Sequence, residues 1–186
     1  KAYGTFFIAA GTAYFACLVG TYLFSFNAKK HVNAAVASEF NYLEDFLTDK
    51  SLIIALSQSG ETIDVIEPLQ RAQEKGSQIA ALVNNLGSTL FRMADYKILI
   101  GAGPEKAVAS TKAYIAKVSL LFLISHALAG GMKKAKAQLL NAADEASYLL
   151  RQENVTAIKP LASRLATKEH IYTLGRGISY PTALEA

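Results

Sequence analysis

Short uncharged runs that alternate with helix-like segments constrain the fold of this chain more than any other feature. The runs have the length of buried strands, and the segments between them carry apolar residues at helical spacing. We predict five strands, at residues 5–10, 31–37, 52–56, 78–83 and 96–100. This alternation indicates right-handed βαβ crossovers, which join parallel strands and place helices on both faces of the sheet. The predicted fold is therefore α/β, a three-layer α-β-α sandwich around a five-stranded parallel sheet.

The helices are predicted from the same spacing, at residues 14–27, 38–46, 63–75, 89–94, 111–128, 133–151 and 156–167. Ser38 is the capping candidate of the second, and Gly76 suits the C-terminal end of the third. Pro68 lies inside that third helix and lacks a backbone donor, so we expect a kink or a restart there. The helix at 111–128 is so apolar that we expect it to be largely buried.

Residues 6–26 carry no charge and reach the length of a membrane span. Gly11-Thr12-Ala13 interrupts this run at the point where a strand would pass into a helix, and similar units follow downstream. We therefore expect a cytoplasmic protein with no membrane partner. The one cysteine, Cys17, excludes an internal disulfide and a multi-cysteine metal site, and its apolar surroundings predict a buried side chain.

Composition narrows the function classes further. Hydrophobic residues make up 52% of the 186 residues and charged ones 18%, so the chain can bury a core and is not disordered. The formal net charge is +4. The most basic stretch holds Lys133, Lys134 and Lys136, which suit the solvated face of a helix. No aromatic residues are interleaved with these lysines, so we expect no nucleic-acid partner.

Polar residues gather directly after the third predicted strand, in the segment Ser57-Gln58-Ser59-Gly60-Glu61-Thr62, called the hydroxyl turn below. A strand, a small hydroxyl-rich turn and a helix start offer free backbone N–H groups and the positive end of a helix dipole. The turn has no lysine, so it is not a Walker-type nucleotide loop. A sugar phosphate fits this anion site better. The alternative is an ordinary connection in which Thr62 is simply an N-cap.

Two other loops are also rich in small or hydroxyl residues. Residues 11–13 follow the first predicted strand, and residues 108–111 lead into the helix predicted at 111–128. In open parallel sheets, ligands bind beyond the carboxyl ends of the strands. We expect these two loops to converge with the hydroxyl turn on one site.

The end of the chain repeats the plan of its beginning. Residues 7–17 and 172–183 each show a strand-like run, a glycine turn and an aromatic residue at a helix start. We therefore predict a strand at 170–174 and a helix from Tyr180. The predicted domains are 1–154 as a first unit, and 155–186 as a linker helix and the start of a second.

The motifs SQSGET (57–62), VASTK (108–112) and Gly11-Thr12 resemble the sugar isomerase (SIS) family. GPEKAVASTK (103–112) and GRGISYPTALE (175–185) make the resemblance closer to the isomerase half of glucosamine-fructose-6-phosphate aminotransferases. The resemblance covers nearly the whole chain. It implies a flavodoxin-like sheet, a homodimer, and a bound hexose 6-phosphate, either fructose 6-phosphate or glucosamine 6-phosphate.

The resemblance also implies the site residues. The residues matching phosphate contacts in the family are Thr12, Ser57, Gln58, Ser59 and Thr62, and those matching sugar contacts are Val108 and Ser110. The family usually has Cys-Gly-Thr-Ser in the first turn, where this chain has Ala10-Gly11-Thr12-Ala13. Ala13 thus removes one phosphate donor, and a hydrogen bond to a charged group contributes roughly 1.5–3 kcal/mol.

Catalysis needs a positioned base, and the resemblance places the family's catalytic residues downstream of Ala186. Arg176 and Glu185 match family positions that are not the base, and the three histidines match no catalytic position. We expect no catalytic residue, no cofactor and no metal, and no turnover by this chain alone. Two alternatives remain: a SIS sensor module that binds a phosphosugar, and another SIS isomerase or deglycase of an amino-sugar phosphate. The GPEKAVASTK loop favours the aminotransferase.

Overall fold

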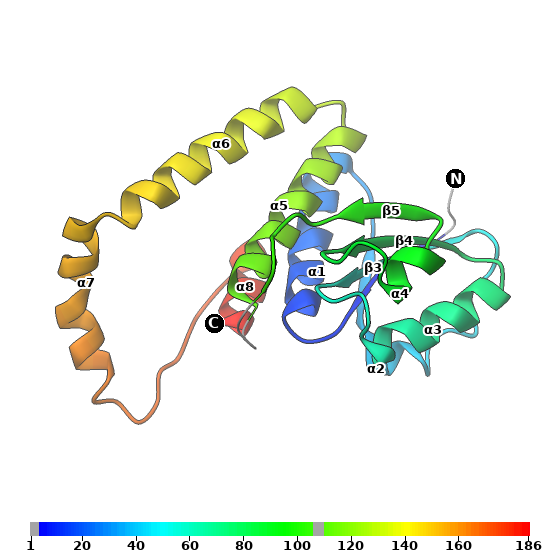
Figure 1. Ribbon diagram of the computed structural model, residues 1–186, viewed down its shortest axis with the longest axis horizontal. Coiled ribbons are helices and arrows are strands. Elements are labelled where there is room, and N and C mark those ends of the chain that lie inside the picture. The colour runs from blue at the N-terminus through cyan, green and yellow to red at the C-terminus, as the bar shows by residue number, and fades with distance from the viewer. Residues whose placement is uncertain (1–3, 106–109) are drawn as a thin grey trace.

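The computed structural model describes residues 4–105 and 110–186, and its centre is a parallel sheet of five strands in the order β2-β1-β3-β4-β5 (Figure 1). The strands are β1 (Gly4–Ala9), β2 (Asn33–Val36), β3 (Ser51–Ser57), β4 (Gln78–Val83) and β5 (Tyr96–Leu99). The predicted five-stranded parallel sheet is confirmed, with the flavodoxin-like order. The chain runs outward from β1 to one edge and then from β3 to the other, so the switch point lies between β1 and β3.

One face of the sheet is covered by α1 (Thr12–Leu23) and α5 (Thr111–Leu128). Residues 24–28 extend α1 as a short π-helix, and Phe24 meets Phe7 of β1 edge to face at 5.1 Å. Cys17 is fully buried in this layer, as predicted. The segment at 6–26, long enough to span a bilayer, is thus a core strand followed by a core helix.

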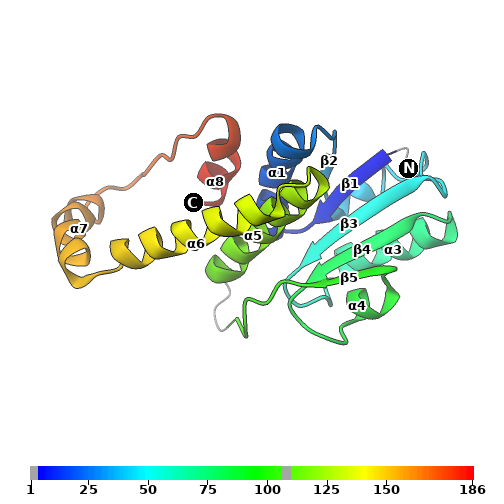
Figure 2. The same ribbon diagram turned by 90° about the horizontal axis from the view of Figure 1, so that it is seen from above.

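The opposite face is covered by α2 (Ala37–Phe40), α3 (Ile63–Glu74) and α4 (Thr89–Met93). Their buried residues form a second core with the alternate side chains of the strands. Figure 2 shows the three layers in section, with α1 and α5 on one side of the sheet and α3 and α4 on the other. α3 runs through Pro68 without restarting, and Gly76 follows its end with φ +81°.

The helix predicted at 38–46 is wrong beyond Phe40. Single i+3 hydrogen bonds replace helical ones there, from Tyr42 N to Glu39 O and from Leu43 N to Phe40 O. Ser38 does not cap α2, whose N-cap position is Val36. The chain turns because Glu44 is directed inward, where it accepts a hydrogen bond from Arg71 of α3.

α5 is less buried than we predicted. Its inner face is buried against α1 and the sheet, but Ile115 on the outer face is 62% exposed. Across residues 4–105 and 110–186, α5 is the one helix whose length and hydropathy would suit a membrane span. A core helix of a soluble protein passes the same test, and the buried face of α5 carries a charged residue, Lys117. The prediction failed because one face of α5 has no further layer over it in the described chain.

Beyond α5 the chain leaves the sandwich as an arm of two helices, α6 (Met132–Leu149) and α7 (Gln152–Leu165), seen at the left of Figure 1. Lys133, Lys134 and Lys136 are exposed on α6, as predicted. The strand predicted at 170–174 does not form, since no described strand lies beside it to supply hydrogen bonds. The chain then returns through a 3₁₀ turn (Gly177–Ser179) to α8 (Tyr180–Glu185), which packs against α1.

Candidate functional site

A cavity of about 290 Å³ lies at the switch point of the sheet, beyond the carboxyl ends of β1 and β3. Six of the seven residues predicted from the sequence line it: Thr12, Ser57, Gln58, Ser59, Thr62 and Ser110. The seventh, Val108, lies outside the described residues. The loops after β1 and β3 and the start of α5 therefore converge, and we call this cavity the switch-point pocket.

The hydroxyl turn is held in shape by its own side chains. Ser57 Oγ accepts a hydrogen bond from the Gly60 backbone N–H at 3.0 Å and lies 3.1 Å from Thr62 Oγ1. Ser59 Oγ accepts from the Glu61 N–H at 3.1 Å. Ser57 is only 3% exposed, so its hydroxyl shapes the turn from beneath. Ser59 is partly exposed at the pocket.

Thr62 occupies the N-cap position of α3, but its side chain makes no capping hydrogen bond. Its hydroxyl faces Ser57 across the turn instead. The first-turn amides of α3 are therefore not satisfied by this side chain, which is the geometry that an anion site needs. The alternative view of Thr62 as a plain capping side chain does not fit these contacts.

Three helices begin around the pocket. α1 starts at Thr12, α3 follows Thr62, and α5 starts directly after Ser110, whose side chain likewise makes no capping hydrogen bond. Each helix is at least 12 residues long, so each N-terminus carries a partial positive charge. The pocket thus combines donor hydroxyls with three converging positive dipole ends.

A second set of contacts fixes the turn against α4. Gly60 has φ +71°, its carbonyl accepts from the Leu90 N–H at 3.0 Å, and a Cβ at this position would lie 2.6 Å from Ser88 Cβ. The Glu61 carboxylate accepts a hydrogen bond from the Thr89 N–H at 2.8 Å. Hydrogen bonding to the side chain and backbone of Thr89 lowers the pKa of Glu61. Glycine is therefore required at position 60 by both backbone conformation and space.

Lys117 is the site residue that sequence reasoning missed. It lies on α5, 1% exposed, and lines the switch-point pocket although the hydroxyl turn itself has no lysine. Burial lowers the pKa of Lys117, while the negative charges that Cys17, Glu185 and Glu105 can carry act in the opposite direction. The available signal is a lysine in the middle of a strongly apolar helix that the sequence predicts to be largely buried.

The pocket offers hydrogen-bond donors of the kind that suit an anion, and no paired acid and base lines it among the described residues. Within the same residues no group of three or more histidine, cysteine or acidic side chains is placed to hold a metal ion. Binding and orientation of a phosphate ester are what this arrangement can do chemically.

Comparison with known proteins gives concordant results. The SIS domain family model matches residues 2–127. Glutamine–fructose-6-phosphate aminotransferases (isomerizing) of Thermococcus kodakarensis and Caldanaerobacter subterraneus are 38% and 39% identical to this chain, over 96% and 97% of its length. The chain spans 31% of each of those relatives, about a third. The C-terminal domain of glucosamine-fructose-6-phosphate aminotransferase from Francisella tularensis superposes with TM-score 0.85 at 28% identity, covering 99% of this chain and 54% of that one.

Proposed function

This chain belongs to the SIS domain family, and we propose that it binds a hexose 6-phosphate, fructose 6-phosphate or glucosamine 6-phosphate, in the switch-point pocket. The observation that carries the proposal is that five hydroxyl side chains and three helix N-termini meet at one cavity. The hydroxyl side chains are those of Thr12, Ser57, Ser59, Thr62 and Ser110. Hydroxyls and helix N-termini together favour a phosphate group over a neutral ligand.

The whole protein, we propose, is an isomerizing glutamine–fructose-6-phosphate aminotransferase. The similarity over nearly the full chain to proteins of that name supports this activity. In that protein residues 1–154 would form the first SIS domain, and 155–186 a linker helix and the start of the second. Within the site, Thr12, Ser57, Gln58, Ser59 and Thr62 would bind the phosphate, and Val108 and Ser110 the sugar.

A cytoplasmic homodimer is the assembly that we propose for it. The exposed apolar side chains of the two arm helices are evidence for a partner subunit, because such side chains are usually covered. Leu149 is 62% exposed and Leu161 is 51% exposed. If the arm helices form the dimer contact, sedimentation equilibrium of this chain should show a dimer, and a monomer at all concentrations would contradict a homodimer formed through the arm.

A thermal-shift titration tests the binding proposal. A ligand that binds only the folded chain raises the melting temperature, by roughly 5–10 °C at a concentration 100 times its Kd. We expect fructose 6-phosphate to produce this shift and fructose, its matched neutral control, to produce none. Equal shifts with both sugars, or no shift with millimolar fructose 6-phosphate, would contradict phosphate recognition in this chain.

A further inference from the structure

Lys117 enters the switch-point pocket from a different element than the hydroxyls do. It lies on the inner face of α5, two turns after Ser110 and beside Tyr114 and Leu121, which are both buried. Its long side chain is 1% exposed and lines the same cavity as Ser57 and Thr62. The Lys117 side chain is therefore part of the pocket wall and hardly reaches the outer surface.

The charge of Lys117 has no close negative partner in the described part of the chain. The ion pairs among the described residues join other side chains, and the lysines whose ammonium groups form hydrogen bonds there are Lys29, Lys75 and Lys112. An ammonium group taken out of water is costly unless a negative group pairs with it. Among the described residues, Lys117 is thus a buried cation for which no ion pair is found, although Glu105 and Glu185 act on its charge from farther away.

The groups that face Lys117 from the neighbouring elements are three. Cys17 of α1 is fully buried, and burial raises the pKa of its thiol well above the ordinary value, so the thiol is neutral at physiological pH. Glu105, in the loop after β5, and Glu185 of α8 raise the pKa of Lys117, but neither lies within ion-pair distance of it.

We propose that Lys117 is the cationic contact of the phosphate ester, so that the switch-point pocket selects a doubly charged ester by direct charge pairing. This inference rests on the proposed function and adds a specificity-determining residue to it. The ammonium group brings three donors, and a charge-assisted hydrogen bond to phosphate is about twice as strong as a neutral one.

The side of the pocket formed by the turn after β1 is where an added donor matters most. That turn offers the hydroxyl of Thr12, but Ala13 beside it contributes only a methyl group. Lys117, which lines the same cavity, offsets the donor that an alanine at position 13 does not provide. The intact pocket therefore recovers, through Lys117, the phosphate donor that Ala13 removes.

A pH dependence follows, with a definite sign. Phosphate binds the protonated form of Lys117, whose pKa in the empty pocket is below its ordinary value because of burial. Affinity should be highest above the second ionisation of the ester, about pH 6, and should fall as pH rises through the pKa of Lys117. Without a titrating group at position 117, the affinity stays constant across that upper range.

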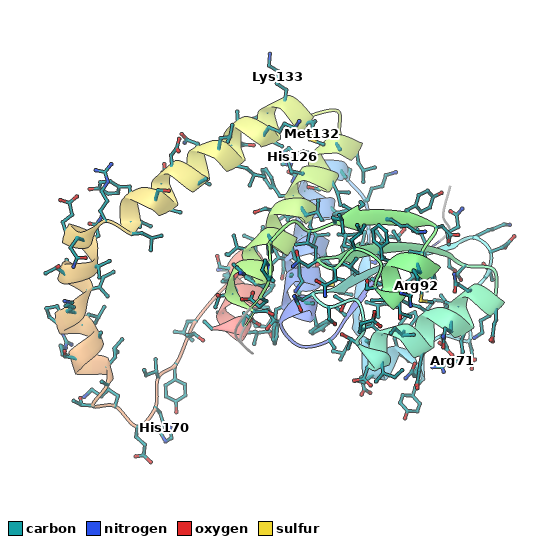
Figure 3. The ribbon with its side chains drawn as sticks, viewed as in Figure 1. Arg71, Arg92, His126, Met132, Lys133 and His170 are labelled. Carbon is teal, nitrogen blue, oxygen red and sulfur yellow. The ribbon has the colours of Figure 1, made fainter. Side chains whose placement is uncertain are left out.

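Calorimetric titration of this chain with fructose 6-phosphate tests the inference, using Lys117→Met and Lys117→Gln as the variants. Lys133→Met is the matched control, since Lys133 projects from the start of α6 into solvent (Figure 3). We expect both Lys117 variants to lose roughly 10- to 100-fold in affinity, and the control to lose less than twofold. The wild-type affinity should fall at high pH, and that of both variants should not.

The outcomes separate the two proposals. If the wild-type chain does not bind fructose 6-phosphate, the proposed function fails. If it binds but the Lys117 variants bind equally well with the same pH profile, the inference about Lys117 is wrong. Thermal unfolding without ligand excludes a folding defect, because removal of a buried unpaired charge should leave the melting temperature unchanged or higher. A lower melting temperature in both variants would also contradict the inference, since it would give Lys117 a structural role.

Discussion

Replacing Gly60 with alanine is expected to lower the free energy of unfolding by roughly 2–4 kcal/mol and to abolish measurable phosphosugar binding. Gly60 has φ +71°, a conformation that costs an alanine about 1–2 kcal/mol. The added Cβ would also collide with Ser88, whose own Cβ is 2.6 Å from that position. Because Ser88 Oγ accepts from Phe91 N at the start of α4, moving Ser88 weakens a helix cap. Urea unfolding measures the stability change.

Gly87→Ala is the matched control for this substitution. Gly87 lies in the loop between β4 and α4, next to Ser88, and has φ +79° with open space where a Cβ would stand. The Gly87→Ala substitution should therefore lower the free energy of unfolding only by the cost of placing an alanine at positive φ, roughly 1–2 kcal/mol. It should leave phosphosugar binding intact. If the two variants were equally destabilised, the close approach of the hydroxyl turn to α4 would not be what requires glycine at position 60.

The second large effect is expected from removing one donor on each side of the pocket. Thr12 comes from the turn after β1 and Ser59 from the turn after β3, and both line the cavity. Thr12→Val and Ser59→Ala should each weaken fructose 6-phosphate binding roughly tenfold, and the double variant roughly 100-fold or more. Folding should be little affected, because the one hydrogen bond that Ser59 Oγ accepts, from Glu61 N–H, can be replaced by water at an exposed position.

Isothermal titration calorimetry of the wild type, the two single variants and the double variant measures these affinities as a double-mutant cycle. Ser38→Ala is the control, since Ser38 lies on α2 and its hydroxyl donates only to Glu39. It should bind like the wild type. A loss in Ser59→Ala with none in Thr12→Val would mean that the turn after β1 is not part of the phosphate site.

The positions of strands and turns could be predicted because they depend mainly on neighbouring residues in the sequence. β4 and α5 begin and end at the predicted residues, and the predicted strand at 52–56 differs from β3 by one residue at each end. Uncharged runs of this length, punctuated by Gly60 and Gly76, allow few other assignments. The residues converging on the pocket followed from topology, since parallel strands end at the same edge.

The errors concern contacts between distant segments. The helix predicted at 38–46 fails because Glu44 is directed toward Arg71, 27 positions later. The strand predicted at 170–174 fails because a strand requires a partner, and none lies beside it among the described residues. Lys117 was missed because only the packing of α5 across the sheet brings it to the hydroxyl turn. The local sequence pattern carries no information on contacts between residues that are far apart in the chain.

The most direct test of the account is a crystal structure of this chain with bound fructose 6-phosphate. We predict that the phosphate lies in the switch-point pocket, with its oxygens within hydrogen-bond distance of Ser59 and Thr12 and paired with the ammonium group of Lys117. A phosphate bound elsewhere on the chain, or an empty switch-point pocket at saturating ligand in crystals whose packing leaves it open, would contradict the central claim.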